Sequence, residues 1–305
     1  MSTEISHKTV HLEEGDLDPP AVTCQVCGRG TDFRFVLRLQ QAPDIDFQQC
    51  ATCSACSVSR MPRDSYLAEF YARYYGEHDQ GVTFRGAARF ARHILASLDV
   101  PSLGGRARIV DYGGGDGSLA CALADTLRER HGVRDLEVVI VDYANRQIAR
   151  DYPVSYCSDL SGLAGSFDVV IASAVLEHVK QPVEVIRRLF AVLNPGGFFY
   201  ARTPYSLPMR RLSAGFDLSF PMHLHDMGNV YWDNFLTTYG LSDCRLLVSR
   251  PSIVSTDFRA NPLVTVLAHA MKFPARVERG FFSRPGRNLL WPFVGGWEVI
   301  IGKSR

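Results

Sequence analysis

The sequence lacks any uninterrupted apolar run that approaches the length of a membrane span, and its polar first 20 residues contain no apolar segment typical of a secretory signal. It also lacks an excess of either charge, because 33 Lys and Arg face 32 Asp and Glu without a basic block. These absences argue against a membrane partner and disfavour a nucleic-acid partner, which usually binds a basic face. With no signal present, the eight cysteines are expected to be reduced and the chain to be cytoplasmic.

The chain does contain enough apolar material for a folded core, since 46% of its 305 residues are hydrophobic. This length suits one large or two modest domains. We expect a flexible N-terminus over 1–20 and a small module with an aromatic connecting helix over 21–80. The main domain should cover 81–305, with an insertion at 252–294 before a last strand at 297–301.

The most informative stretch joins a strand-like run to a helical pattern through a glycine-rich turn. It starts with Asp111 and carries alternate glycines at Gly113, Gly115 and Gly117. Glycine adopts positive φ and lets the backbone approach a ligand closely, and the start of a helix attracts negative charge. The turn therefore predicts a site for a nucleotide-type ligand.

Two acids indicate which nucleotide the turn holds. A dinucleotide site would read G-x-G-x-x-G, whereas Ser118 stands at the third glycine position. Asp111 would repel a pyrophosphate but attract an ammonium group, which S-adenosylmethionine carries. Asp142 ends the next buried strand, where an acid binds ribose hydroxyls in either kind of site. The charges favour S-adenosylmethionine.

These motifs resemble those of the class I S-adenosylmethionine-dependent methyltransferases over about residues 83–203. The similar segments, in chain order, are 111–117, 141–142, 158–160, 166–179 and 193–198. The resemblance implies that residues 81–305 form the methyltransferase domain. It also implies that Tyr143, Asp159, Leu160 and Ser173 contact the cofactor, with Asp159 and the backbone after it at the adenine.

The fold class follows from the order of the elements together with this resemblance. Strand and helix patterns alternate, which predicts an α/β domain with a parallel sheet and helices on both faces. The resemblance adds a Rossmann-like order of strands, with one strand near the C-terminus antiparallel to its neighbours. Ligands of such sheets bind at the carboxyl ends of the strands, where Asp111, Asp142 and Asp159 are expected.

Cysteines are concentrated before this domain. Cys24 and Cys27 form one C-x-x-C pair, and Cys50 and Cys53 form another after an intervening strand-like segment. Two such pairs can hold a structural Zn²⁺ in a closed tetrahedral site. Cys56 is the alternate ligand in place of Cys50 or Cys53. A redox pair or chance clustering is the competing interpretation.

The connecting segment extends the resemblance. A zinc-binding module followed by an aromatic-rich helix occurs in a subset of methyltransferases that includes sugar C-methyltransferases, and 61–62 and 71–75 are similar to that stretch. Tyr74 or Tyr75 would then lie over the cofactor, although aromatic packing between modules is an equal alternative.

Candidate catalytic residues follow the fifth strand. His223 and His225 could each act as a general base near neutral pH, or they could cap and pack the following helix. A metal site of these histidines with Asp226 lacks a further ligand nearby in sequence. Glu177 and His178 follow the fourth strand, where a structural or positioning role is favoured over proton transfer.

The sequence thus predicts methyl transfer from S-adenosylmethionine to a small-molecule acceptor, with a sugar or another specialised metabolite as the leading class. The acceptor atom (oxygen, nitrogen or carbon) and the oligomeric state stay open. An RNA methyltransferase that grips its substrate through the zinc module, and a cofactor-binding protein without turnover, are the alternatives.

Overall fold

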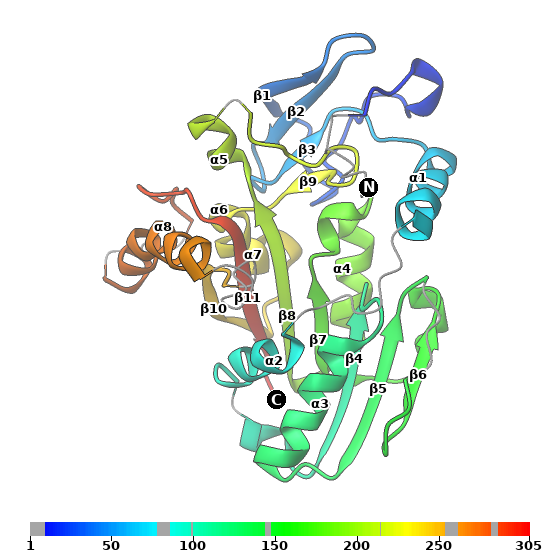
Figure 1. Cartoon of the computed structure of the whole chain (residues 1–305), viewed down its shortest axis with the longest axis vertical. Helices are drawn as coiled ribbons and strands as arrows, with labels where there is room; N and C mark the ends of the chain where they lie inside the picture. Colours follow the sequence, from blue (N-terminus) through cyan, green and yellow to red (C-terminus); the bar gives the residue numbers. More distant parts are fainter. Residues whose placement is uncertain are drawn as a thin grey trace.

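The computed structural model places two sheets one above the other, with helices packed around the larger one (Figure 1). It describes residues 10–77, 86–98, 100–143, 148–213, 215–253, 262–281 and 286–305.

The larger sheet has seven strands and is mostly parallel. In spatial order it comprises β10 (Cys244–Pro251), β11 (Gly295–Lys303), β8 (Leu193–Tyr205), β7 (Phe167–Ser173), β4 (Arg106–Tyr112), β5 (Asp135–Val141) and β6 (Val154–Cys157). The five strands from β8 to β6 run parallel, whereas β11 runs antiparallel to both β8 and β10. The predicted parallel sheet with one antiparallel strand near the C-terminus is confirmed.

Helices cover both faces of this sheet because neighbouring strand residues point to opposite sides. Ile109 and Val169 pack with α2 (Ala87–Leu95) and α3 (Ser118–His131), while Val110 and Val170 pack on the other face. That second face is covered by α4 (Pro182–Ala191), α6 (Asn229–Asp233) and α7 (Phe235–Tyr239). The predicted two-sided α/β arrangement is confirmed.

The smaller sheet combines segments that are far apart in the sequence. Its order is β1 (Phe33–Gln40), β2 (Ile45–Cys50), β3 (Cys56–Val58) and β9 (His225–Asp226), all antiparallel. In Figure 1 the yellow β9 lies beside the blue β3, and Cys56 pairs with Asp226. A short strand from the predicted main domain therefore completes the sheet of the predicted N-terminal module. The domain limits at 21–80 and 81–305 stay predictions.

The described part of the N-terminal segment is packed, which corrects the expectation of a loose segment for residues 10–20. Leu12 and Leu17 are both buried, and Leu17 forms a β-bridge with Pro62. The Gln40 side-chain amide also donates a hydrogen bond to the Leu12 carbonyl at 2.8 Å. The acidic composition of this segment gave no indication that Leu12 and Leu17 would be buried. The 3-10 helix η1 (Glu14–Asp16) lies between them.

Other described elements are the helix that follows β3 and four shorter ones, of which one precedes β4 and the others follow β6, β7 and β8. They are α1 (Asp64–Glu77), η2 (Val100–Leu103), η3 (Leu160–Gly162), η4 (Leu176–His178) and α5 (Leu207–Leu212).

The predicted insertion lies between β10 and β11 and contains a long helix, α8 (Pro262–Phe281). This helix buries Thr265 and Lys272, whereas Leu263, Leu267 and Phe273 are exposed. Over the described residues, none of the helices combines the length and the apolar character that a membrane crossing requires.

Candidate active site

The glycine turn between β4 and α3 has the backbone that its sequence predicted. Gly113, Gly115 and Gly117 all have positive φ, at 69°, 56° and 74°. A Cβ atom on Gly113 would lie 2.3 Å from a methyl group of Val175, and one on Gly117 would lie 2.1 Å from Ile140. Both conformation and space therefore require glycine at 113 and 117, and the turn brings the backbone to the start of α3.

The structure brings Asp111 and Asp142 to the same edge of the sheet because β4 and β5 are parallel neighbours. The Gly115 amide donates a hydrogen bond to the Asp142 carboxylate at 2.8 Å, which ties the turn to the second strand. Asp111 is 2% exposed, and burial, followed by the negative fields of Asp142 and Asp116, raises its pKa to about 8. This edge is therefore a place where a cation would be stabilised.

The other predicted cofactor contacts lie at neighbouring strand ends. Asp159 accepts a hydrogen bond from the Ser161 amide at 2.6 Å and so caps η3, and Leu160 is half-buried. Ser173 ends β7 and accepts a hydrogen bond from the Arg202 guanidinium at 3.2 Å. The Tyr143 side chain is exposed. Their cofactor contacts stay predictions, and the side chains of Tyr74 and Tyr75 lie outside the described residues.

The geometry of His225 does not fit the predicted catalytic role. Its ring is 1% exposed, and its Nε2 donates a hydrogen bond to the Val179 carbonyl at 2.8 Å. Its Nδ1 lies 2.7 Å from the Ser57 hydroxyl, which donates to it. Burial lowers the pKa of His225 to about 4. With both ring nitrogens engaged in local contacts, His225 holds β9 against β3.

His223 instead belongs to a polar cluster at the end of β7. Ligand-type atoms of Glu177, His178 and His223 all lie within 4.8 Å of one another. The His178 and His223 rings meet edge to face at 4.9 Å between centroids. The Tyr71 hydroxyl from α1 lies 3.4 Å from Nδ1 of His178, so a third segment reaches this cluster. The sequence marked this helix as aromatic, but no local signal singled out Tyr71.

Burial controls the protonation of this cluster. Glu177 is 2% exposed, and burial raises its pKa to about 8, although the positive charge of Arg202 opposes the shift. Burial, together with the charge of His223, lowers the pKa of His178 to about 3. At neutral pH His178 is therefore an uncharged ring, and much of Glu177 carries its proton when no cation is near.

The four predicted cysteine ligands form one compact cluster. Sγ of Cys24 lies 3.8 Å from that of Cys53, and Sγ of Cys27 lies 3.9 Å from that of Cys50. A tetrahedron with Zn–S bonds of about 2.3 Å has edges of about 3.8 Å, so the spacing fits a zinc ion. Cys56 is not part of this cluster. The choice of Cys24, Cys27, Cys50 and Cys53 as zinc ligands stays a prediction.

The two C-x-x-C pairs form matching turns. The Gly28 amide donates to the Cys24 carbonyl at 2.7 Å, and the Ser54 amide donates to the Cys50 carbonyl at 2.9 Å. Gly28 and Ser54 both have positive φ, at 70° and 63°. Each residue after the second cysteine thus turns the chain in the same way and directs two thiols to one centre.

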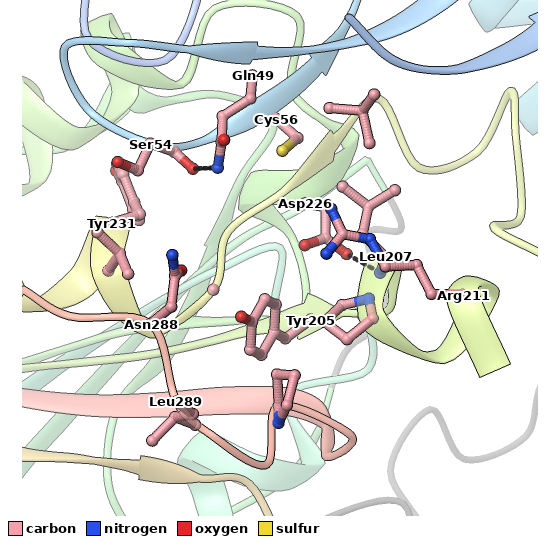
Figure 2. Close-up of a pocket in the computed structure, with 15 residues that line it drawn as sticks. Gln49, Ser54, Cys56, Tyr205, Leu207, Arg211, Asp226, Tyr231, Asn288 and Leu289 are labelled. Carbon is pink, nitrogen blue, oxygen red and sulfur yellow. Dashed lines mark hydrogen bonds between the residues drawn. The ribbon is translucent and has the colours of Figure 1, made fainter. Parts of the chain in front are cut away.

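A pocket of about 230 Å³ lies where the two sheets meet (Figure 2). Cys56, Tyr205, Arg211 and Asp226 line it, and Figure 2 shows the Arg211 side chain extending towards Asp226. The Asp226 carboxylate accepts a hydrogen bond from the Leu207 amide at 3.1 Å. Asp226 thus faces this pocket and does not join the histidines, so the metal site considered from His223, His225 and Asp226 is not formed.

The strand order and the glycine turn define a Rossmann-like domain of the kind that binds a nucleotide cofactor at the carboxyl edge of its sheet. The chain belongs to the methyltransferase family: residues 75–241 match the family described as "Methyltransferase domain".

Named relatives agree with this assignment. The ubiquinone biosynthesis O-methyltransferase of Cereibacter sphaeroides is 28% identical over 171 residues, which cover 53% of this chain and 66% of that protein. The arsenite methyltransferase of Aquipseudomonas alcaligenes is 24% identical over 245 residues, covering 74% and 65%. The chain spans slightly less than two thirds of the length of these relatives.

Two solved structures that resemble this chain are less similar to it in sequence than the named relatives are. The plantazolicin methyltransferase BpumL in complex with a triazolic desmethylPZN analog and SAH has a TM-score of 0.47 at 13% identity, covering 79% of this chain and 92% of that one. An S-adenosylmethionine-dependent methyltransferase from Mesorhizobium loti has a TM-score of 0.43 at 20% identity, covering 72% and 99%.

Proposed function

We propose that this protein transfers the methyl group of S-adenosylmethionine to a small-molecule acceptor. The observation that carries the proposal is the buried Asp111 carboxyl at the glycine turn, inside the segment that matches the methyltransferase family. In this proposal Asp111 attracts the ammonium group and Asp142 binds the ribose hydroxyls. Asp159 and Leu160 hold the adenine, and Tyr143 and Ser173 complete the cofactor site.

The chemistry requires alignment more than activation, because the sulfonium donor is already reactive. The acceptor atom forms a bond to the methyl carbon while the carbon–sulfur bond breaks, and the donor leaves as the thioether. An acceptor hydroxyl must also lose its proton, and we assign His223 as the group that takes it. A positioned base contributes roughly 10²–10⁴-fold to the rate.

The relatives narrow the acceptor within this proposal. Ubiquinone biosynthesis O-methyltransferases are named for transfer to oxygen, which supports a hydroxyl group as the acceptor here. A sugar carbon, which the resemblance to sugar C-methyltransferases suggests, is the competing acceptor. Both are small molecules, and both need a group that removes a proton.

Cys24, Cys27, Cys50 and Cys53 are proposed to hold a structural zinc ion. Four thiolate ligands leave no open position for water or substrate, so this ion would fix the fold and would not take part in the reaction. Metal analysis of the purified protein should find one tightly bound zinc per chain at this centre.

The test uses S-adenosylmethionine with a labelled methyl group and a metabolite extract as the source of acceptors. Asp142→Ala should mainly weaken cofactor binding, whereas His223→Ala should mainly slow turnover, with His131→Ala on the exposed end of α3 as the matched control. Tight binding of NAD or FAD without binding of S-adenosylmethionine or its thioether product would refute the proposal.

A further inference from the structure

The cluster at the end of β7 is held together by the backbone as well as by its side chains. Glu177 and His178 are neighbours in η4, and His223 comes from the segment that precedes β9. The Leu224 amide donates a hydrogen bond to the Glu177 carbonyl at 2.8 Å, so the two segments lie side by side. The three side chains therefore meet at a fixed place in the fold.

One atom of this cluster lacks the partner that a buried polar atom needs. Oε2 of Glu177 is buried and has no hydrogen-bond partner among the described residues. Leaving such a group unsatisfied costs about 1–3 kcal/mol, and more for a charged group. A buried carboxylate oxygen without a partner, on a side chain whose other oxygen lies 3.9 Å from Nε2 of His178, indicates that something else binds there.

The orientation of His178 is the one that metal-binding histidines have. Its Nδ1 lies 2.9 Å from the Met222 carbonyl and donates a hydrogen bond to it, because a carbonyl can only accept. The lone pair is thus on Nε2, which lies 3.9 Å from Oε1 of Glu177. Histidine ligands typically donate their other N–H to a backbone carbonyl in this way, which fixes the ring and its tautomer.

We propose that Glu177, His178 and His223 bind a divalent transition-metal ion. Two imidazoles and a carboxylate suit zinc and its neighbours in the first transition row. Ligand atoms about 2.1 Å from an ion lie at most about 4.2 Å apart. A separation of 4.8 Å, the upper limit within this cluster, would therefore have to shorten by at least about 0.6 Å on binding.

This site differs in kind from the four-cysteine centre. Three protein ligands leave at least one coordination position open, and an oxygen of the acceptor could occupy it. His223 would then act as a metal ligand instead of as the proton acceptor assigned above. The ion would lower the pKa of the bound acceptor hydroxyl, whose proton would pass to solvent. This role in the reaction rests on the proposed methyl transfer, but binding of the ion does not.

The charged groups around the cluster set the conditions for binding. The positive field of Arg202 and the negative field of Asp226 both reach Glu177. The negative field of Asp226 therefore favours a bound cation at this cluster, and the positive field of Arg202 opposes it.

The experiment titrates Zn²⁺ into protein that already carries its four-cysteine zinc, followed by calorimetry. The wild type should bind one further ion per chain. Glu177→Gln, which keeps the size of the side chain, and His223→Ala should each weaken that binding at least tenfold, while His131→Ala should bind like the wild type. The proposal would be overturned if the wild type bound no further ion, or if the two cluster variants bound it as tightly as the wild type does.

A cofactor titration on the same samples separates this proposal from the proposed function. Binding of the second ion without any binding of S-adenosylmethionine would leave the metal site standing and remove the methyltransferase assignment. Binding of S-adenosylmethionine without a second ion would remove the metal site and leave the methyltransferase assignment standing. Unchanged thermal melting of the variants would show that they fold.

Discussion

The charge of Asp111 should make cofactor binding depend strongly on pH. Burial raises its pKa to about 8, so below that pH most of the protein carries a neutral carboxyl that attracts an ammonium group weakly. Binding of the cation favours the ionised form and releases the proton. The sign therefore follows directly: affinity for S-adenosylmethionine should rise with pH until about pH 8.

The magnitude follows from the same pKa. At pH 7 about one carboxyl in ten is ionised, so the affinity should be about tenfold below its limit, which corresponds to about 1.4 kcal/mol. Each unit of pH below that should cost about another factor of ten. The range from about pH 5.5 to 7 is suitable because an α-amino group, with a pKa of about 7.7–8.0, stays protonated there.

Calorimetry over this range, in buffers of different ionisation enthalpy, measures both the affinity and the protons released. Asp111→Asn should bind weakly and without this slope, and methylthioadenosine, which lacks the amino-acid part, should show no slope with either protein. A flat profile in the wild type, or the same slope in Asp111→Asn, would refute the assignment of Asp111 to the ammonium group.

Other variants test the structural roles of residues around the site. His225→Ala should lower the free energy of unfolding by about 2–4 kcal/mol in urea titrations, because it removes two buried hydrogen bonds; unchanged stability with lost activity would contradict this. Gly30→Ala should lose zinc to a chelator faster than the wild type, because its Cβ would lie 2.3 Å from Sγ of Cys50. Gly15→Ala, which meets nothing within 4 Å among the described residues, is the control. Cys56→Ser should keep the zinc content of the wild type, and a loss would place Cys56 among the ligands.

The large sheet was predictable because its signals are local. Apolar runs that end in an acid marked β4 and β5, and the glycines at Gly113 and Gly117 marked a turn that no other residue fits. The C-x-x-C spacing similarly identified four thiols that meet in space. In each case neighbouring residues determine the conformation, so the sequence pattern is sufficient.

The distinction between the two candidate histidines depends on partners that are distant in the sequence. His225 is engaged by Ser57, which is 168 positions away, and His223 meets the ring of His178, which is 45 positions away. No pattern within 220–228 encodes these contacts. For the same reason the sequence did not predict that Leu12 and Leu17 anchor the start of the described chain.

Because β3 pairs with β9, the first 80 residues cannot be removed without changing the structure of the remaining chain. A fragment that begins at residue 81 would leave β9 as an unpaired edge and His225 without its serine partner. Because His223 lies only two positions before His225, the loop that carries it would lose its support in such a fragment. The cysteine cluster belongs to the same module as β3. We therefore expect zinc binding by the cysteines to stabilise the loop that carries His223, although that loop contains no cysteine.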